Sequence, residues 1–583
     1  MKLDFIGSMS KNRSTAIDGQ ECINWYTEYY APTTFDAVNT RHQGAKSDKA
    51  NLPTPGTKLF ATCEGNGGIR GEWYSSDGRM FAVCGNTLNE ITMFGQTVSR
   101  GTLKTSSGLV SFSENINGQD RGNGLIIVDG VYGYMFNLST LQFLQITDVA
   151  FPRCSHVVFL NGYFIVNELG TNKFWFSNLY NGLDWGDVLT LDQAPEALNI
   201  SAGLKTFTTT VEPVGSQIFD YSGATCTLSN SYGWMSGDIK SYDQTTGTMV
   251  VDVKTFYGNG TFPGWTVMTY GPGSTVFGTT ESVPDTISAI APLHGELHVF
   301  GNSSTDVFAN NSASSGIPGD FESIRGAAVG IGIAAPFSLA SNGSQLFWLA
   351  SSNEGHGLVY SVSGYQPVSI SSNTVCHMIE RLPKIDDAIG FCYLQDGHSF
   401  YVLTFPTANI TFCYDVSTGD WHQRSYWNMK TGQHERHRVN AQCFAYQKNY
   451  VGDYANGNIY ELSMDVFTDN GNPIRRVRTG PHVHNDRKRL FFLEFEIDIE
   501  RGVGSDGGVQ GKDAQAFLTW SDDGGMTWSN ERWLTFGKIG EYKNRLHTHR
   551  LGMSRDRVFR LTLSDPVKCV LIAARCDVKM EEG

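Results

Sequence analysis

The sequence predicts an all-β protein: a β-propeller of six or seven blades with an inserted small β domain and a C-terminal β-sandwich-like domain. Composition is the first reason. The 583 residues include 64 Gly, 12 Trp, 24 Tyr and 35 Phe but only 17% charged residues, a mixture typical of strands joined by tight turns. A repeat along the chain and a change in composition towards its C-terminal end are the other two reasons.

The repeat consists of a turn, an apolar strand, a polar turn and a second strand. Apart from one gap, the copies start roughly 40 to 55 residues apart, which is the spacing of four-stranded propeller blades. A β-sandwich or a series of unrelated hairpins is the alternative, because no intact WD or kelch signature accompanies the repeat. The copies lie at residues 77–83, 123–128, 161–166, 294–300, 342–348, 396–402 and 448–454.

The gap in the repeat and the change in composition set the expected domain boundaries. Residues 196–286 are rich in Thr, Ser, Gly and Tyr and indicate a small β domain inserted between blades. The first blades are expected at 51–195 and the remaining blades at 287–465. Residues 466–583 are expected to form a C-terminal β platform domain, to which an N-terminal arm, residues 1–50, contributes.

The sharpest local motif matches the Asp-box pattern S-x-D-x-G-x-T-W of sialidases and other propellers. Its Asp accepts hydrogen bonds from turn amides, its Gly permits positive φ, and its Trp is expected to be buried beneath the hairpin. The motif therefore predicts a stabilised hairpin and not a catalytic site. Its residues are Ser521, Asp523, Gly525, Thr527 and Trp528.

A regular alternation follows the start of the C-terminal domain. We expect one face of this strand to carry Phe491, Leu493, Phe495, Ile497 and Ile499. The other face would carry Glu494, Glu496, Asp498 and Glu500. Carboxylates about 6.7 Å apart would repel a phosphate backbone, so this face is a candidate channel lining. An ordinary solvated sheet face is the alternative.

Basic residues cluster immediately before this strand. They are candidates for docking on an acidic partner or touching DNA phosphates, with plain solubility as the alternative. The formal net charge of −14 argues against a surface that holds DNA tightly, because that affinity depends on Lys and Arg. The cluster comprises Arg475, Arg476, Arg478, Arg487, Lys488 and Arg489.

Other site chemistry is not expected. Glycoside hydrolysis needs two carboxylates about 5 to 9.5 Å apart, and nothing in the sequence singles out such a pair. His482 and His484 share one strand face without a third metal ligand. The 11 cysteines include no CxxC pair, which favours reduced thiols, and neither a signal peptide nor a membrane span is expected. We expect no enzyme activity, cofactor or metal.

Several stretches resemble one known family, the packaged-DNA stabilisation proteins, also called tail hub or nozzle proteins, of short-tailed phages. LPTPG at 52–56 and NGYFIVN at 161–167 are two examples. The resemblance covers most of 50–195 and 287–580, and no match is seen in the segment between them. The remaining stretches are 68–71, 364–367, 400–409, 418–422, 451–462, 469–476, 537–542 and 556–559.

The resemblance implies a structural virion protein, assembled in the host cytoplasm, that forms a homohexamer in the tail. Its partners would be the portal and the ring of head-to-tail adaptors, a needle or plug at the distal end, and a tail spike or fibre. The ring would retain packaged DNA and later let double-stranded DNA pass without specific binding, with the inserted domain as a candidate nozzle tip. A glycan-degrading propeller and a lectin-like receptor module are the alternatives, and no catalytic residue is implied.

Overall fold

The computed structural model consists almost entirely of strands, with one α-helix, α2 (Asn373–Glu380), in its described part. No helix there is long and apolar enough to cross a membrane. The contacts divide the chain into two compact units, Met1–Leu109 with Gly330–Gly583, and Val110–Val329. The structure describes residues 2–30, 47–115, 124–148, 150–177, 180–183, 185, 189–194, 196–209, 225–230, 232–243, 246–269, 277–280, 285–311, 321–351, 358–486, 488–502 and 513–580.

Four groups of four strands in the first unit have the antiparallel meander of a propeller blade, and three of these groups belong to larger sheets. Their strands are β8 (Ile69–Tyr74), β9 (Met80–Cys84), β10 (Thr87–Ile91) and β11 (Thr97–Thr102); β32 (Gly332–Ile333), β34 (Leu346–Ser351), β35 (Val359–Val362) and β36 (Val368–Ser369); β37 (Ile389–Gln395), β38 (His398–Phe405), β39 (Ile410–Asp415) and β40 (Asp420–Asn428); and β42 (Val439–Ala445), β43 (Lys448–Asp453), β44 (Asn458–Ser463) and β7 (Gly56–Thr62). In the last group β7, from the N-terminal part of the chain, pairs with β44. A strand from one end of the chain thus completes a group whose other three strands come from far along it.

Three further sheets of this kind lie in the second unit. Their strands are β12 (Ser111–Asn115), β13 (Gly124–Val128), β14 (Gly133–Asn137) and β15 (Phe143–Gln145); β16 (Val157–Leu160), β17 (Tyr163–Asn167), β18 (Lys173–Phe176) and β27 (Phe277–Thr279); and β28 (Ile287–Leu293), β29 (Glu296–Gly301), β30 (Thr305–Asn310) and β31 (Phe321–Ser323). The described residues therefore form seven blade-type groups of strands, and each copy of the sequence repeat provides the second strand of one of them.

The residues that the turns require explain why the repeat can be recognised in the sequence. Asp396 and Gly397 have φ angles of 49° and 83°, and Asn161 and Gly162 have φ angles of 51° and 91°. Two successive positive φ angles are characteristic of the tight type I′ hairpin turn, which Asn, Asp and Gly tolerate best. Each turn delivers a strand such as β17, whose five residues are all buried.

The inserted domain is a six-stranded antiparallel sheet with its own apolar core, which includes Trp265 and Met249. The expectation that it lies between blades is wrong. Because β27 follows it in sequence and pairs with β18, it interrupts a blade between the third and fourth strands. Its strands, in sheet order, are β19 (Leu189–Ala194), β26 (Trp265–Thr269), β22 (Thr225–Asn230), β23 (Gly233–Asp243), β24 (Thr248–Tyr257) and β21 (Gly203–Thr208).

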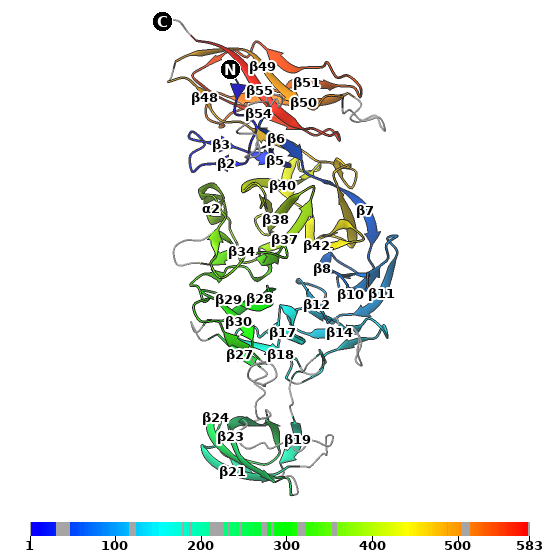
Figure 1. The fold of residues 1–583 in the computed structure, drawn as a ribbon, viewed down its shortest axis with the longest axis vertical. Coiled ribbons are helices and arrows are strands. Elements are labelled where there is room, and N and C mark those ends of the chain that lie inside the picture. Colours follow the sequence, from blue (N-terminus) through cyan, green and yellow to red (C-terminus); the bar gives the residue numbers. More distant parts are fainter. Residues whose placement is uncertain are drawn as a thin grey trace, which may run out of the picture. The chain divides into compact units, whose positions relative to one another are not determined.

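The C-terminal residues form two sheets that also take up N-terminal strands, and β1 pairs with β55, the last described strand (Figure 1). The first sheet contains β1 (Lys2–Leu3), β5 (Trp25–Tyr29), β6 (Lys49–Pro53), β49 (Leu490–Ile499), β52 (Leu546–His549), β53 (Met553–Ser554) and β55 (Leu571–Met580). The second contains β4 (Cys22–Ile23), β47 (Arg476–Thr479), β48 (Val483–His484), β50 (Ala514–Ser521), β51 (Arg532–Gly537) and β54 (Asp556–Leu563), and β4 also joins it to β40.

Aromatic side chains connect these two sheets. The rings of Phe495 on β49 and Phe559 on β54 stack with centroids 4.5 Å apart, and Phe5 meets Phe495 edge-on at 6.0 Å. Trp25 is fully buried, and its indole N–H donates to the Cys569 carbonyl at 3.0 Å. Burial of aromatic rings with their polar groups satisfied is the main stabilising contribution here.

Candidate functional site

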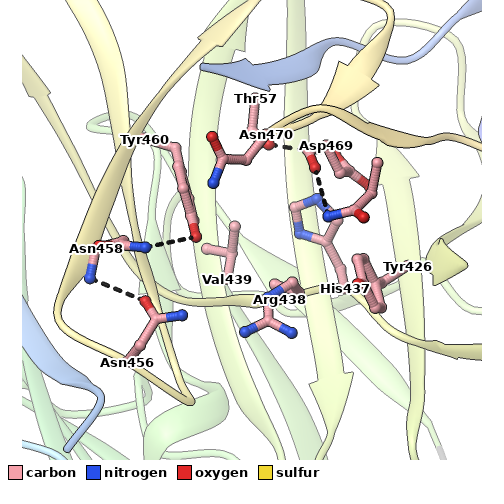
Figure 2. A pocket seen from close by; sticks show the side chains of 11 residues that line it. Thr57, Tyr426, His437, Arg438, Val439, Asn456, Asn458, Tyr460, Asp469 and Asn470 are labelled. Atoms are coloured by element: carbon pink, nitrogen blue, oxygen red, sulfur yellow. Dashed lines mark hydrogen bonds between the residues drawn. The ribbon is translucent and has the colours of Figure 1, made fainter. Parts of the chain in front are cut away.

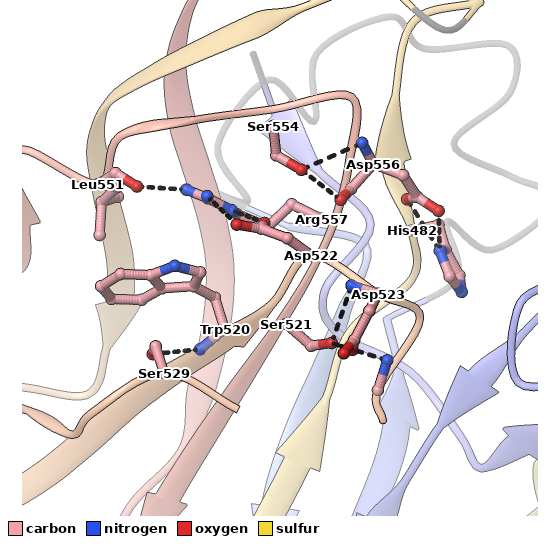
Figure 3. Close-up of polar contacts among 11 residues, drawn as sticks. His482, Trp520, Ser521, Asp522, Asp523, Ser529, Leu551, Ser554, Asp556 and Arg557 are labelled. Atoms are coloured by element: carbon pink, nitrogen blue, oxygen red, sulfur yellow. Dashed lines mark hydrogen bonds and ion pairs between the residues drawn. The ribbon is translucent and has the colours of Figure 1, made fainter. Parts of the chain in front are cut away.

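The Asp box forms the tip of the hairpin between β50 and β51 (Figure 3). Ser521 donates its hydroxyl to Asp523 at 2.6 Å, and the amide of Gly525 donates to Ser521 at 2.8 Å. Asp523 also accepts from the amide and the hydroxyl of Thr527, at 2.9 and 2.6 Å. These bonds, above all that from Ser521, hold the pKa of Asp523 well below its ordinary value. Each partner lies within the turn, so the network orders the hairpin.

Trp528 departs from the expectation of burial beneath the hairpin. It is half-buried, and the guanidinium of Arg560 lies 3.7 Å from its ring centroid. Arg560 in turn donates to Glu21 at 2.6 Å, which connects the motif to the N-terminal segment. Cation–π stacking therefore takes the place of full burial.

The predicted alternation of β49 is wrong in its first half. A bulge between Phe492 and Glu494 in the pairing with β55 inserts one extra residue. Phe492 is therefore buried, whereas Phe491 and Leu493 are 39% and 38% exposed. From Phe495 to Ile497 the expected alternation holds, but Asp498 is buried as well, and the register with β55 shifts again between Asp498 and Ile499. A bulge moves the side chains before it to the opposite face of the sheet from the one that a regular alternation predicts. The hydrophobic pattern of the strand alone does not indicate the bulge.

The four carboxylates on β49 and directly after it contact cationic side chains. Arg545 makes a two-point contact with Glu496, 2.7 Å for each bond, and reaches Glu494 at 3.4 Å. Asp498 and Glu500 contact Arg501 and Lys568 at 3.1 and 2.9 Å, respectively. The hydrogen bond to Arg545 is the main reason why the pKa of Glu496 is lowered. The face is largely charge-compensated, so its repulsion of phosphate is weaker than the carboxylates alone would give.

Two of the six basic candidates are fully buried and cannot dock on a partner. Arg478 donates to the carbonyls of Phe5 and Ser8 at 2.7 and 2.9 Å and so fixes the N-terminal segment. Among the described residues the guanidinium of Arg476 has no hydrogen-bond partner, and burial lowers its pKa to about 10. The docking interpretation is wrong for this pair, because burial in the fold leaves no contact surface.

The other four basic candidates differ in position. Arg475 is half-buried, with its guanidinium 4.5 Å from the ring centroid of Trp427. Lys488 and Arg489 are exposed, and Arg487 lies outside the described residues. Docking on a partner therefore remains a prediction for Lys488 and Arg489, directly before β49.

The sequence does not indicate the ion pair that a buried arginine makes beside the Asp box. Arg557, whose side chain is 1% exposed, makes two bonds to Asp522, at 2.6 and 2.7 Å (Figure 3). It also donates to the Leu551 carbonyl at 2.6 Å, and its guanidinium lies 4.4 Å from the ring centroid of Phe492. Asp522 and Arg557 lie 35 residues apart in the sequence, so no local signal indicates the pair.

His482 connects β54 to the N-terminal segment. Its Nδ1 donates to the Asp556 carboxylate at 2.8 Å, and its Nε2 donates to the Thr15 carbonyl at 2.8 Å. Because a carbonyl and a carboxylate only accept, both bonds form together only when both ring nitrogens carry protons. Burial lowers the pKa of His482, but the bonds to Thr15 and Asp556 outweigh it and raise the pKa above its ordinary value.

A polar cavity of about 220 Å³ lies beside β7, β42 and β44 (Figure 2). Burial raises the pKa of Asp469 to about 6. Among the described residues that line the cavity, Asp469 is the only acidic one, so the lining lacks the carboxylate pair of a glycoside hydrolase. The lining residues are Thr57, Tyr426, His437, Arg438, Val439, Asn456, Asn458, Tyr460, Asp469, Asn470 and Asn472.

Comparison with known families accounts for both parts of the chain. The family model described as bacteriophage P22 Gp10, beta-propeller, matches residues 28–217 and 204–467. The model described as bacteriophage P22 Gp10, beta-sandwich, matches residues 475–581. The chain belongs to the bacteriophage P22 Gp10 family. Both the predicted fold class and the predicted family are thereby confirmed, and the match extends into the inserted segment, where the motifs had indicated none.

Members of the Gp10 family are tail hub proteins that stabilise packaged DNA, so this chain is a structural component of a phage tail. No curated protein matches the chain. Solved structures similar to it include YCF48, with 10% identity, 78% of this chain and 97% of that chain covered, and a TM-score of 0.31. A catalytically inactive virginiamycin B lyase from Staphylococcus aureus with quinupristin has 9% identity, coverages of 68% and 95%, and a TM-score of 0.35.

Proposed function

We propose that six copies of the chain form a ring that closes the portal–adaptor channel, retains the packaged DNA and later serves as the conduit for DNA ejection. Membership of the Gp10 family, with propeller and sandwich both matched, is the observation that carries this proposal. Head-to-tail contacts between identical subunits close into a ring when the rotation between neighbours is right. The net charge of −14 supports weak adhesion of DNA, which favours passage.

In this proposal the protein acts by geometry and not by catalysis. The Asp box orders its own hairpin, and the carboxylates of β49 are held by Arg and Lys side chains. A glycan-degrading or glycan-binding tail propeller remains the alternative to be tested, but the family matches do not favour it.

The remaining assignments also belong to this proposal. The C-terminal platform, including exposed Lys488 and Arg489, is assigned to contacts with the acidic surface of an adaptor subunit. The inserted domain is assigned to the distal tip, near a needle or plug, with a spike or fibre at the side. The acidic face of β49 is assigned to the channel lining, with its repulsion of DNA reduced by the ion pairs described above.

DNA retention tests the closure role. Filled heads that carry portal and adaptor but lack this chain are mixed with purified protein, and the DNA accessible to nuclease is followed over time. Protection restored by bound protein is the expected result. If the protein joins the tail and DNA still leaks as it does without it, closure is refuted and the glycan alternative is favoured.

Charge reversal tests the channel lining separately. Changing Glu494, Glu496, Asp498 and Glu500 to Lys should slow DNA release, because the new cations would bind passing phosphates. Glu494, Glu496 and Glu500 are partly exposed, whereas Asp498 is buried, so particle assembly with this variant is the control for folding. Unchanged ejection kinetics in well-assembled particles would assign these residues to an ordinary solvated face.

A further inference from the structure

Two histidines and one glutamate converge on one face of the sheet that contains β49 and β52. Glu494 lies on β49, and His547 and His549 lie on β52. Their potential ligand atoms all lie within 4.8 Å of one another. Glu494 is paired directly with His549 across the two strands, and His547, two residues earlier, projects from the same face of β52 as its diagonal neighbour.

The hydrogen bonding of His547 prepares it for metal binding. Its Nδ1 lies 3.1 Å from the Arg545 carbonyl, which can only accept, so Nδ1 carries the proton. In the neutral ring this leaves the lone pair on Nε2. A histidine that donates one ring N–H to a carbonyl while the other nitrogen stays free is the usual arrangement of a metal-binding imidazole.

Glu494 is the least engaged carboxylate of its neighbourhood. Arg545 makes both of its short contacts, 2.7 Å each, with Glu496, whereas its contact with Glu494 is 3.4 Å long. The His549 Nε2 lies 4.0 Å from the Oε1 of Glu494, and the His549 side chain is 58% exposed. His549 is exposed, and Glu494 and His547 are partly buried. Small rotations of these side chains bring three donors to the separation of about 3.3 Å that tetrahedral zinc requires.

We propose that Glu494, His547 and His549 form a binding site for a divalent transition metal, with Zn²⁺ as the best match. Two imidazoles and one carboxylate are a ligand set that zinc accepts, with water in the fourth position. The ion would connect the four-residue strand β52 to β49 at the edge of the sheet. This site goes beyond the proposed closure role, and it concerns how the platform is held together.

Zinc titration of the full-length protein tests the site. Protein stripped with a chelator is titrated with ZnCl₂ by calorimetry, and Co²⁺ replaces Zn²⁺ in a second series to give a visible absorption spectrum. We expect one ion per chain. His549→Ala and Glu494→Gln should each weaken binding by at least about tenfold, since loss of even an outer-shell partner commonly costs 10- to 100-fold.

His484→Ala is the matched control, because His484 is an exposed strand histidine of the same domain outside the cluster. This variant should bind zinc as the wild type does. As a second readout, zinc should slow hydrogen exchange in residues 546–549 of the wild type but not of His549→Ala. The proposal is overturned if the wild type does not bind zinc, if the cluster variants bind it normally, or if His484→Ala loses binding.

Discussion

The ion pair of buried Arg557 with partly exposed Asp522 gives the sharpest test of how the C-terminal sheets are stabilised. In Arg557→Ala, the Leu551 carbonyl loses its donor, and the aromatic ring of Phe492 loses a stacked guanidinium. Leaving a buried acceptor without its donor costs about 1 to 3 kcal/mol, and a desolvated cation–π contact is worth about 2 kcal/mol. Asp522 is 44% exposed and can be rehydrated, so the loss of its ion pair adds little, and we take about 3 kcal/mol in all. This corresponds to an opening equilibrium roughly 100-fold more favourable.

Hydrogen exchange measured by mass spectrometry reads this local opening directly in the full-length protein. Peptides from β50 and β54 in Arg557→Ala should exchange roughly 100-fold faster than in the wild type. Arg545→Ala is the control, since it removes an equally short two-point contact to Glu496 at the surface. Its effect on β49 and β52 should stay within about fivefold, because water replaces an exposed ion pair. Equal effects of the two variants would refute the argument from burial.

Three further predictions test single residues. His482→Gln should lower the unfolding temperature most near about pH 5.5. The difference in unfolding temperature from the wild type should become smaller as the pH rises through the raised pKa of the folded state, because the bound proton stabilises the fold only below that pKa. A difference that grows with pH would contradict this. Asp523→Ala should speed hydrogen exchange at the hairpin tip alone, and an unchanged tip would show that the network is not needed there. Gly68→Ala would place a Cβ 1.9 Å from the Tyr454 carbonyl oxygen and should lower the free energy of unfolding by about 1 to 3 kcal/mol, measured by thermal unfolding. Gly364 has open space around it, so Gly364→Ala should leave the free energy of unfolding unchanged.

The elements that local chemistry determines could be predicted from the sequence. The turn at Asp396 and Gly397 appears in the repeat because positive φ selects particular residues, and the strand after it is apolar because the sheet is buried. The Asp box was likewise readable, since its donors and acceptor lie within a few residues of one another. Seven such repeats were enough to indicate a propeller.

Features that depend on distant partners could not be predicted. Nothing in the sequence of either strand indicates that β18 pairs with β27 across the inserted domain. The bulge at Leu493 arises from the pairing with β55, so the period of β49 alone gave the wrong face for Phe491. The sequence indicates that Arg476 and Arg478 lie on the surface, but strands distant in sequence bury both side chains.

The central claim is that the bound ring closes the DNA channel, and a titration tests it most directly. Increasing amounts of protein are added to filled heads that lack it, and the bound copies and the nuclease-resistant DNA are measured on the same particles. Protection should appear only as binding saturates, at six copies per head, because an incomplete ring leaves the channel open. Full occupancy with DNA still degraded as fast as in bare heads would contradict the account.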